Sequence, residues 1–144
     1  MNDVEELIDL ASGNNPEAKA FLYAWHRYCH LIDDVVDGEE PTIKAAQVGR
    51  WANDLYSSAF YQRFSVVLGP QVQLITCHYE DSVEMEKSKE RWQRTVADVI
   101  RSNGADMVRM VAFIVGGYSL MRQISIPLRA LCWREHHTIE GDPK

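Results

Sequence analysis

The sequence lacks the features that define several classes of protein. It has three cysteines in 144 residues, widely spaced and odd in number, which argues against a disulfide framework and favours reduced thiols. Lysine and arginine number 15 against 21 acidic residues, too few for a protein that grips phosphate backbones. The longest apolar run, residues 110–121, ends at Arg109 and Arg122 and falls short of the about 20 residues that span a bilayer. We therefore expect a cytoplasmic protein that binds neither nucleic acid nor a membrane.

Strand signals are also absent, because no segment alternates β-branched and polar residues with a period of two. Glycine and proline divide the chain into segments of helical length. This pattern predicts an all-α fold, a compact bundle of about five to seven helices, in a single domain spanning residues 1–144. Residues 1–14 hold a short first helix in this prediction, and residues 136–144 form a polar tail. Residues 105–124 are apolar around almost the whole helical circumference, which predicts a central buried helix.

Capping residues predict where the helices begin and end. Asn15-Pro16-Glu17 is a typical helix start, and Gly38 is a typical stop, so the second helix is expected to end at Asp37. A third helix is expected over 43–59, with a bent continuation to 64, and Gly69-Pro70 is expected to break the chain before a helix over 71–87. The next helix is expected to begin at 88 and to end at Asn103, with Gly104 as its C-terminal cap. Pro127 is expected to start or kink the last helix.

The second helix carries an acidic stripe opposite its apolar side. His26, His30, Asp33 and Asp37 are spaced by four, three and four residues and share one side of the helix, with Asp34 at its border. The carboxylates repel one another near a helix C-terminus, where the macrodipole already disfavours acids. A divalent ion such as Mg²⁺ relieves this repulsion, because it binds one or two carboxylates together with water and phosphates. The alternative is an acidic face exposed to solvent.

A second acidic pair lies on the expected helix over 71–87. Asp81 and Glu84 share one side of this helix with apolar residues such as Leu74 and Cys77. Because carboxylates among apolar neighbours are costly unless paired or metal-bound, we expect this pair to belong to an interior site. The alternative is an acidic helix that faces nearby lysines and arginines.

The stretch Cys29-His30-Leu31-Ile32-Asp33-Asp34-Val35-Val36-Asp37-Gly38-Glu39 resembles the first aspartate-rich motif of squalene/phytoene synthases and related isoprenoid synthases. The resemblance implies that Asp33, Asp34 and Asp37 hold Mg²⁺ against a diphosphate. Residues Ile75, Thr76, Asp81 and Glu84 are loosely similar to the second motif of that family.

The two acidic pairs are also similar in arrangement to those of the all-α nucleoside triphosphate pyrophosphatases, which include dimeric dUTPases and MazG-like enzymes. This resemblance implies that Asp34 and Asp37 on one helix, with Asp81 and Glu84 on another, coordinate Mg²⁺, or Mn²⁺ in its place, at the phosphates of a nucleotide.

Other residues could complete such a site or form a different one. Lys44, Arg50 and Arg109 could neutralise phosphates, although Arg109 could equally be a buried ion-pair partner of an acid. His26 and His30 have the helical spacing of zinc or iron ligands, which normally need further histidines. No glycine-rich phosphate loop is present in the sequence, and no serine or cysteine stands beside an evident base.

The functional hypothesis is a Mg²⁺-dependent phosphohydrolase that acts on a diphosphate-containing small molecule, and nucleoside triphosphate pyrophosphohydrolysis is its most specific form. Asp33 would act as a metal ligand or as the base for the attacking water. One alternative is a non-enzymatic, oligomeric helical bundle with an aromatic interface, and a second is an isoprenoid-diphosphate-binding protein. A chain this short is expected to complete its cleft as a dimer or another homo-oligomer.

Overall fold

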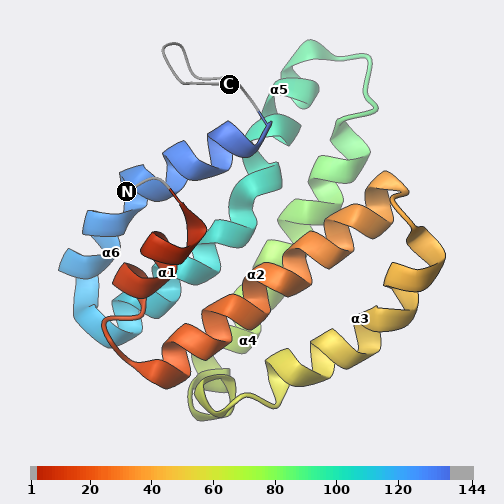
Figure 1. Ribbon diagram of the computed structural model, residues 1–144. Helices are drawn as coiled ribbons and strands as arrows, with labels where there is room; N and C mark the ends of the chain where they lie inside the picture. Colours follow the sequence, from red (N-terminus) through yellow and green to blue (C-terminus); the bar gives the residue numbers. More distant parts are fainter. Residues whose placement is uncertain (1–2, 137–144) are drawn as a thin grey trace.

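The computed structural model describes residues 3–136, and the fold is all-α, as the sequence predicts (Figure 1). No strand occurs in this range. The elements are α1 (Val4–Ala11), α2 (Pro16–Asp37), α3 (Pro41–Tyr56), α4 (Ala59–Met85), α5 (Arg91–Ile100), the 3₁₀ helix η1 (Arg101–Ala105) and α6 (Asp106–His136). The predicted polar tail lies outside the described residues from 137 onwards.

Helix α2 crosses the middle of the molecule, and α1, α3, α4 and α6 pack against it (Figure 1). Helix α3 turns back alongside α2, α4 lies behind it, and α1 packs between α2 and α6. The segment α5–η1 connects the end of α4 to α6 and contacts both. Buried side chains from five of the α-helices form one core, which includes Leu7, Phe21, Trp25, Leu55, Phe60, Leu68, Ile75, Met107, Val111 and Ile124.

Local chemistry sets the ends of α2. The side chain of Asn15 accepts hydrogen bonds from the backbone N–H groups of Glu17 and Ala18, which would otherwise lack partners in the first turn. At the other end, Gly38 adopts a left-handed conformation with φ of 79°, which ends the helix at Asp37. The expected start and end of this helix are therefore confirmed.

The expected boundaries of the next two helices are wrong. Helix α3 stops at Tyr56, and Ser58 caps a new helix by accepting the backbone N–H of Tyr61. Helix α4 then runs on through Gly69-Pro70 and departs from helical geometry only at Phe64. Pro70 and Val66, whose carbonyl would pair with residue 70, are both exposed, so water can replace the missing hydrogen bond.

Gly104 does not cap α5, contrary to the expectation. Helix α5 ends at Ile100, and Gly104 lies within η1, where its backbone is not left-handed. The carbonyl of Gly104 accepts a hydrogen bond of 2.9 Å from the indole nitrogen of Trp25. A long-range contact to α2 therefore determines the backbone here, which the local sequence does not show.

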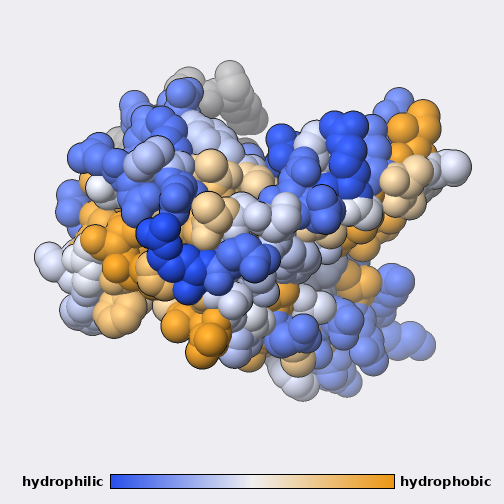
Figure 2. Space-filling model, turned by 90° about the horizontal axis from the view of Figure 1, so that it is seen from below, coloured by the Kyte–Doolittle hydropathy of each residue, from blue (hydrophilic) through white to orange (hydrophobic). Residues whose placement is uncertain are grey.

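The long apolar helix is present as α6, and its break lies at Gly117 rather than at Pro127. Gly117 has φ of 74° and ψ of −172°, a conformation open essentially to glycine alone. On either side of the break, α6 buries Met107, Val111, Ala112, Ile124 and Leu128. It also exposes the large side chains Phe113, Tyr118, Ile126 and Trp133. Hydrophobic patches lie among hydrophilic ones on the face drawn in Figure 2, one of them on the α6 side of the molecule.

The continuous stretch Arg91–Glu135 contains one window that could cross a membrane by length and composition alone, and 28% of that window is buried in the fold. Core helices of other folds meet the same criterion. The feature is therefore weak evidence for a membrane segment.

We predict that Gly117→Ala lowers the free energy of unfolding by about 1 to 2 kcal/mol, because a Cβ atom is strained at this φ and ψ. A Cβ atom at Gly117 would meet no other atom within 4 Å, so the cost comes from the backbone and not from a clash. Urea denaturation followed by circular dichroism measures the effect. The matched control is Gly49→Ala on the exposed side of α3, which should stabilise the protein by about 0.5 to 1 kcal/mol. Equal effects at the two positions would contradict the prediction.

Candidate functional site

The carboxylate of Asp33 is held by side chains from two other elements. The hydroxyl of Tyr79, on α4, donates to Asp33 Oδ1 at 2.8 Å. Arg101, on η1, donates to the same oxygen from Nη1 at 3.1 Å. Asp33 thus connects α2 to the end of α4 and to the segment that follows α5.

Arg101 is the centre of this group of side chains. Its side chain is only 14% exposed, and it donates a second hydrogen bond to Glu86, at the end of α4. Its guanidinium carbon lies 5.2 Å from the ring centroid of Tyr79, within the range of a cation–π contact. Burial lowers the pKa of Arg101, but its interactions with Glu86, Tyr79 and Asp33 outweigh burial and leave the pKa raised. Arg101 is therefore a permanent cation between two carboxylates.

Tyr79 remains a hydrogen-bond donor over the working range of pH. Burial, and then the hydrogen bond to Asp33, raise the pKa of Tyr79. Two donors thus fix Oδ1 of Asp33, while no partner for Oδ2 is found among residues 3–136. One oxygen is held in place and the second remains able to bind a metal ion or a water molecule, as is common for metal-binding carboxylates.

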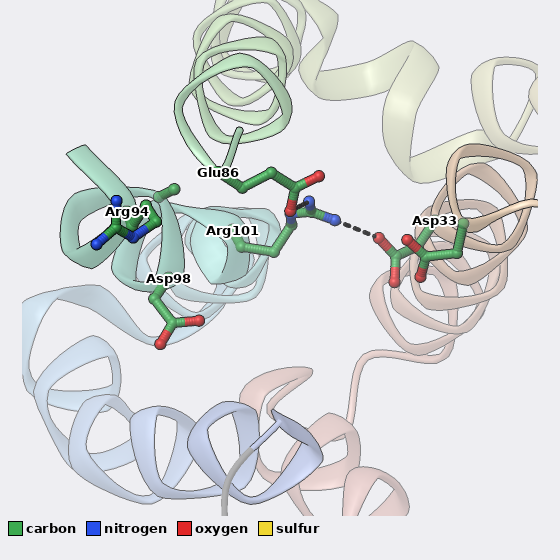
Figure 3. A pocket seen from close by; sticks show the side chains of 7 residues that line it. Asp33, Glu86, Arg94, Asp98 and Arg101 are labelled. Atoms are coloured by element: carbon green, nitrogen blue, oxygen red, sulfur yellow. Dashed lines mark hydrogen bonds and ion pairs between the residues drawn. The ribbon is translucent and has the colours of Figure 1, made fainter. Parts of the chain in front are cut away.

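A hollow of about 240 Å³ opens beside Asp33, between α2, the end of α4 and α5. In Figure 3, Arg101 projects between Glu86 and Asp33, and Arg94 and Asp98 lie on the neighbouring helix α5. The lining of the hollow consists of Asp33, Asp37, Glu86, Arg94, Ala97, Asp98 and Arg101. Four carboxylates and two guanidinium groups make this lining strongly polar, with an excess of negative charge.

The structure places the predicted carboxylates of α2 on two different surfaces. Asp33 and Asp37 are one helical turn apart and both line the hollow. Asp34 instead forms an ion pair of 2.9 Å with Lys44 of α3, and the hydrogen bond between them raises the pKa of Lys44. The acidic stripe is therefore divided, and Asp34 does not belong to the lining.

Asp81 and Glu84 are exposed and do not line the hollow, so the expectation of an interior pair is wrong. Helix α4 turns Ile75 and Ser82 into the core. At about 100° per residue, this orientation carries Asp81 and Glu84 away from the buried side. The structure brings Glu86 to the site instead.

The three basic residues proposed for phosphate binding lie elsewhere. Lys44 pairs with Asp34 and Glu39. Arg50 stacks on Trp51, with 4.1 Å between its guanidinium carbon and the ring centroid. Arg109 donates to Asp106 and Ser125, which agrees with the ion-pair alternative. The cations at the hollow are Arg94 and Arg101.

Sequence reasoning missed five residues at this site, namely Tyr79, Glu86, Arg94, Asp98 and Arg101. The sequence does not indicate the role of Tyr79, because a hydroxyl whose partner is 46 residues away leaves no local pattern. Arg101 lies 68 residues from Asp33 in the chain, so spacing rules do not connect them. The one signal in the sequence is that residues 91–101 contain three arginines and follow the acidic segment 80–86.

The carboxylates that line the hollow fit a hard metal ion that needs few protein ligands. No group of three or more histidine, cysteine, aspartate or glutamate side chains converges on one point within the described part of the chain. Mg²⁺ is commonly held by one or two carboxylates and completes its octahedron with water and phosphate oxygens. Asp33 and Asp37, with oxygen donors on one helical stripe, match this requirement.

His26 and His30 form a separate pair on α2. Their ring centroids are 4.3 Å apart, with 74° between the ring planes. Partial burial, and then the proximity of His30, lower the pKa of His26. Neither residue lines the hollow.

Comparisons with known proteins give no match, either to protein-family models, to curated proteins or to solved structures. The geometry of the site is therefore the basis on which a function can be proposed.

Proposed function

We propose that the protein is a Mg²⁺-dependent phosphohydrolase that acts on a diphosphate-containing small molecule, with nucleoside triphosphate pyrophosphohydrolysis as its most specific form. The observation that carries the proposal is the Asp33 carboxylate, which Tyr79 and Arg101 fix through one oxygen at the edge of a charged hollow. A fixed carboxylate is suited to bind a metal ion or to orient an attacking water.

The charges around the hollow suit a divalent ion, and its two guanidinium groups suit phosphate oxygens. Four carboxylates and two guanidinium groups leave an excess of two negative charges, which one Mg²⁺ ion would cancel. Asp33 and Asp37 would bind the ion, and Arg94 and Arg101 would face the phosphate oxygens. Bound Mg²⁺ would supply charge neutralisation and a more acidic water.

The size and lining of the hollow favour a small polar group. A volume of about 240 Å³ lies below the roughly 300 to 1,000 Å³ of pockets that enclose a whole drug-sized ligand. A diphosphate with its ion is small enough to enter, while the organic part of the substrate would remain outside. Ala97 is the one apolar residue among the described residues of the lining, so an enclosed isoprenoid chain is a poorer fit.

A second candidate is an oligomeric interaction module, which the surface of α5 favours. The α5 stripe, consisting of Trp92, Val96 and Val99, is exposed although its members recur at helical spacing. An exposed apolar stripe of this kind is typical of a surface that another protein covers. Such a module would also account for the homo-oligomer expected from the short chain.

A substrate screen tests the proposed function. Nucleoside triphosphates, nucleoside diphosphates and prenyl diphosphates are incubated with the protein and Mg²⁺, and the release of phosphate and pyrophosphate is measured. We expect turnover of at least one class, loss of turnover with excess EDTA, and recovery with Mg²⁺ or Mn²⁺. Absence of release across all classes, together with concentration-dependent association of the protein, would favour the interaction module instead.

A further inference from the structure

The pair His26 and His30 has the helical spacing of a two-imidazole chelate, and the two rings are in contact. The residues are one helical turn apart on α2, and their rings meet edge to face with centroids 4.3 Å apart. Two imidazoles bound to one tetrahedral zinc ion, with Zn–N distances of about 2.1 Å, place their centroids about 5 Å apart. To bind an ion, the rings therefore need to separate by about 1 Å and to turn about their side-chain bonds so that one nitrogen of each faces the ion.

No other side chain competes for the nitrogen atoms of the pair. Within residues 3–136, neither ring forms a hydrogen bond to a protein group. The neighbouring charged groups on α2 have other partners: Asp33 accepts from Tyr79 and Arg101, Asp34 pairs with Lys44, and Arg27 stacks on Trp51. His30 is exposed, so a hydrated ion can reach the pair directly.

We propose that His26 and His30 bind one borderline divalent transition-metal ion of the Zn²⁺, Ni²⁺ or Cu²⁺ class, with water in the remaining coordination positions. Imidazole nitrogen suits these ions, whereas Mg²⁺ prefers oxygen. The site is thus distinct in chemistry and in residues from the hollow beside Asp33.

Zinc titration by isothermal calorimetry tests the site in a background with fewer competing soft ligands. The 144-residue chain carries Cys77→Ser, His136→Gln and His137→Gln, which leave His78 and the half-buried thiols of Cys29 and Cys132 as the other soft ligands. We expect one Zn²⁺ ion to bind per chain and millimolar Mg²⁺ not to displace it.

Single substitutions in this background decide the assignment. His30→Gln, at an exposed position, should weaken Zn²⁺ binding at least about tenfold, because one of two ligands is lost. His78→Gln on α4 is the matched control and should leave the affinity unchanged. Asp37→Asn, which lies two helical turns from His30 and lines the hollow, should also leave it unchanged, which separates this site from the proposed magnesium site. Absence of Zn²⁺ binding in the background chain, equal affinity in His30→Gln, or loss of binding in His78→Gln would overturn the proposal.

Discussion

Asp33→Asn should reduce the Mg²⁺-dependent release of phosphate or pyrophosphate about 100-fold or more. Asparagine retains an oxygen that can accept the hydrogen bond from Tyr79, so the local geometry is kept while the negative charge is lost. A neutral amide binds Mg²⁺ weakly and cannot accept a proton from water, which removes both roles proposed for Asp33. The rate is measured with the best substrate from the screen, at saturating Mg²⁺.

The matched control for this prediction is Asp81→Asn. Asp81 is also a carboxylate on an α-helix, but it is exposed and does not line the hollow. Its substitution should leave the rate within about twofold. Thermal melting of both variants confirms that each is folded. A rate that falls in Asp81→Asn and is retained in Asp33→Asn would restore the four-carboxylate arrangement expected from the sequence and contradict the site described above.

Arg101→Met should lower the free energy of unfolding by about 2 to 3 kcal/mol. The substitution removes the hydrogen bonds to Asp33 and Glu86 and the contact with the ring of Tyr79, and it leaves the carboxylates without their common cation. The Arg101 side chain is 14% exposed, so water compensates only partly for these losses. Methionine preserves much of the apolar stem, so the measurement reports mainly the charge and its hydrogen bonds.

Lys44→Met provides the comparison for Arg101. Lys44 also pairs with carboxylates on its neighbouring elements, Asp34 and Glu39, but it lies nearer the surface and contacts only one of them closely. Its loss should lower the free energy of unfolding much less than the loss of Arg101, as is usual for exposed ion pairs. Urea denaturation of both variants at low and high salt measures the difference. Equal losses would show that Arg101 does not organise the junction of α2, α4 and η1.

The sequence predicted what depends on neighbouring residues. The two ends of α2 follow from Asn15 and Gly38. The side chain of Asn15 accepts hydrogen bonds from residues two and three positions along the chain, and the backbone of Gly38 can adopt the left-handed conformation that ends the helix. Pro70 misled the prediction, because the cost of a proline depends on whether water can reach the carbonyl that loses its partner. Gly117 was not distinguished from other glycines, since only the packing of both halves of α6 demands its positive φ.

The candidate site was predicted in part, and the error has a geometric cause. Asp33 and Asp37 line the hollow, as their shared stripe on α2 suggested. Asp81 and Glu84 also share a side, but the sequence does not determine how α4 is rotated about its axis. That rotation follows from burial of Ile75 and Ser82, and it turns the acidic pair outward.

The central claim is that a magnesium–diphosphate complex binds in the hollow beside Asp33, and backbone amide chemical shifts measure this directly. The ¹⁵N-labelled protein is titrated with Mg²⁺ and methylenediphosphonate, a diphosphate analogue that resists hydrolysis. We predict the largest saturable shifts in residues 33–37, 86 and 94–101, which carry the lining of the hollow, and their loss in Asp33→Asn. Shifts centred on residues 81–84, or no saturable shift at millimolar ligand, would contradict the claim.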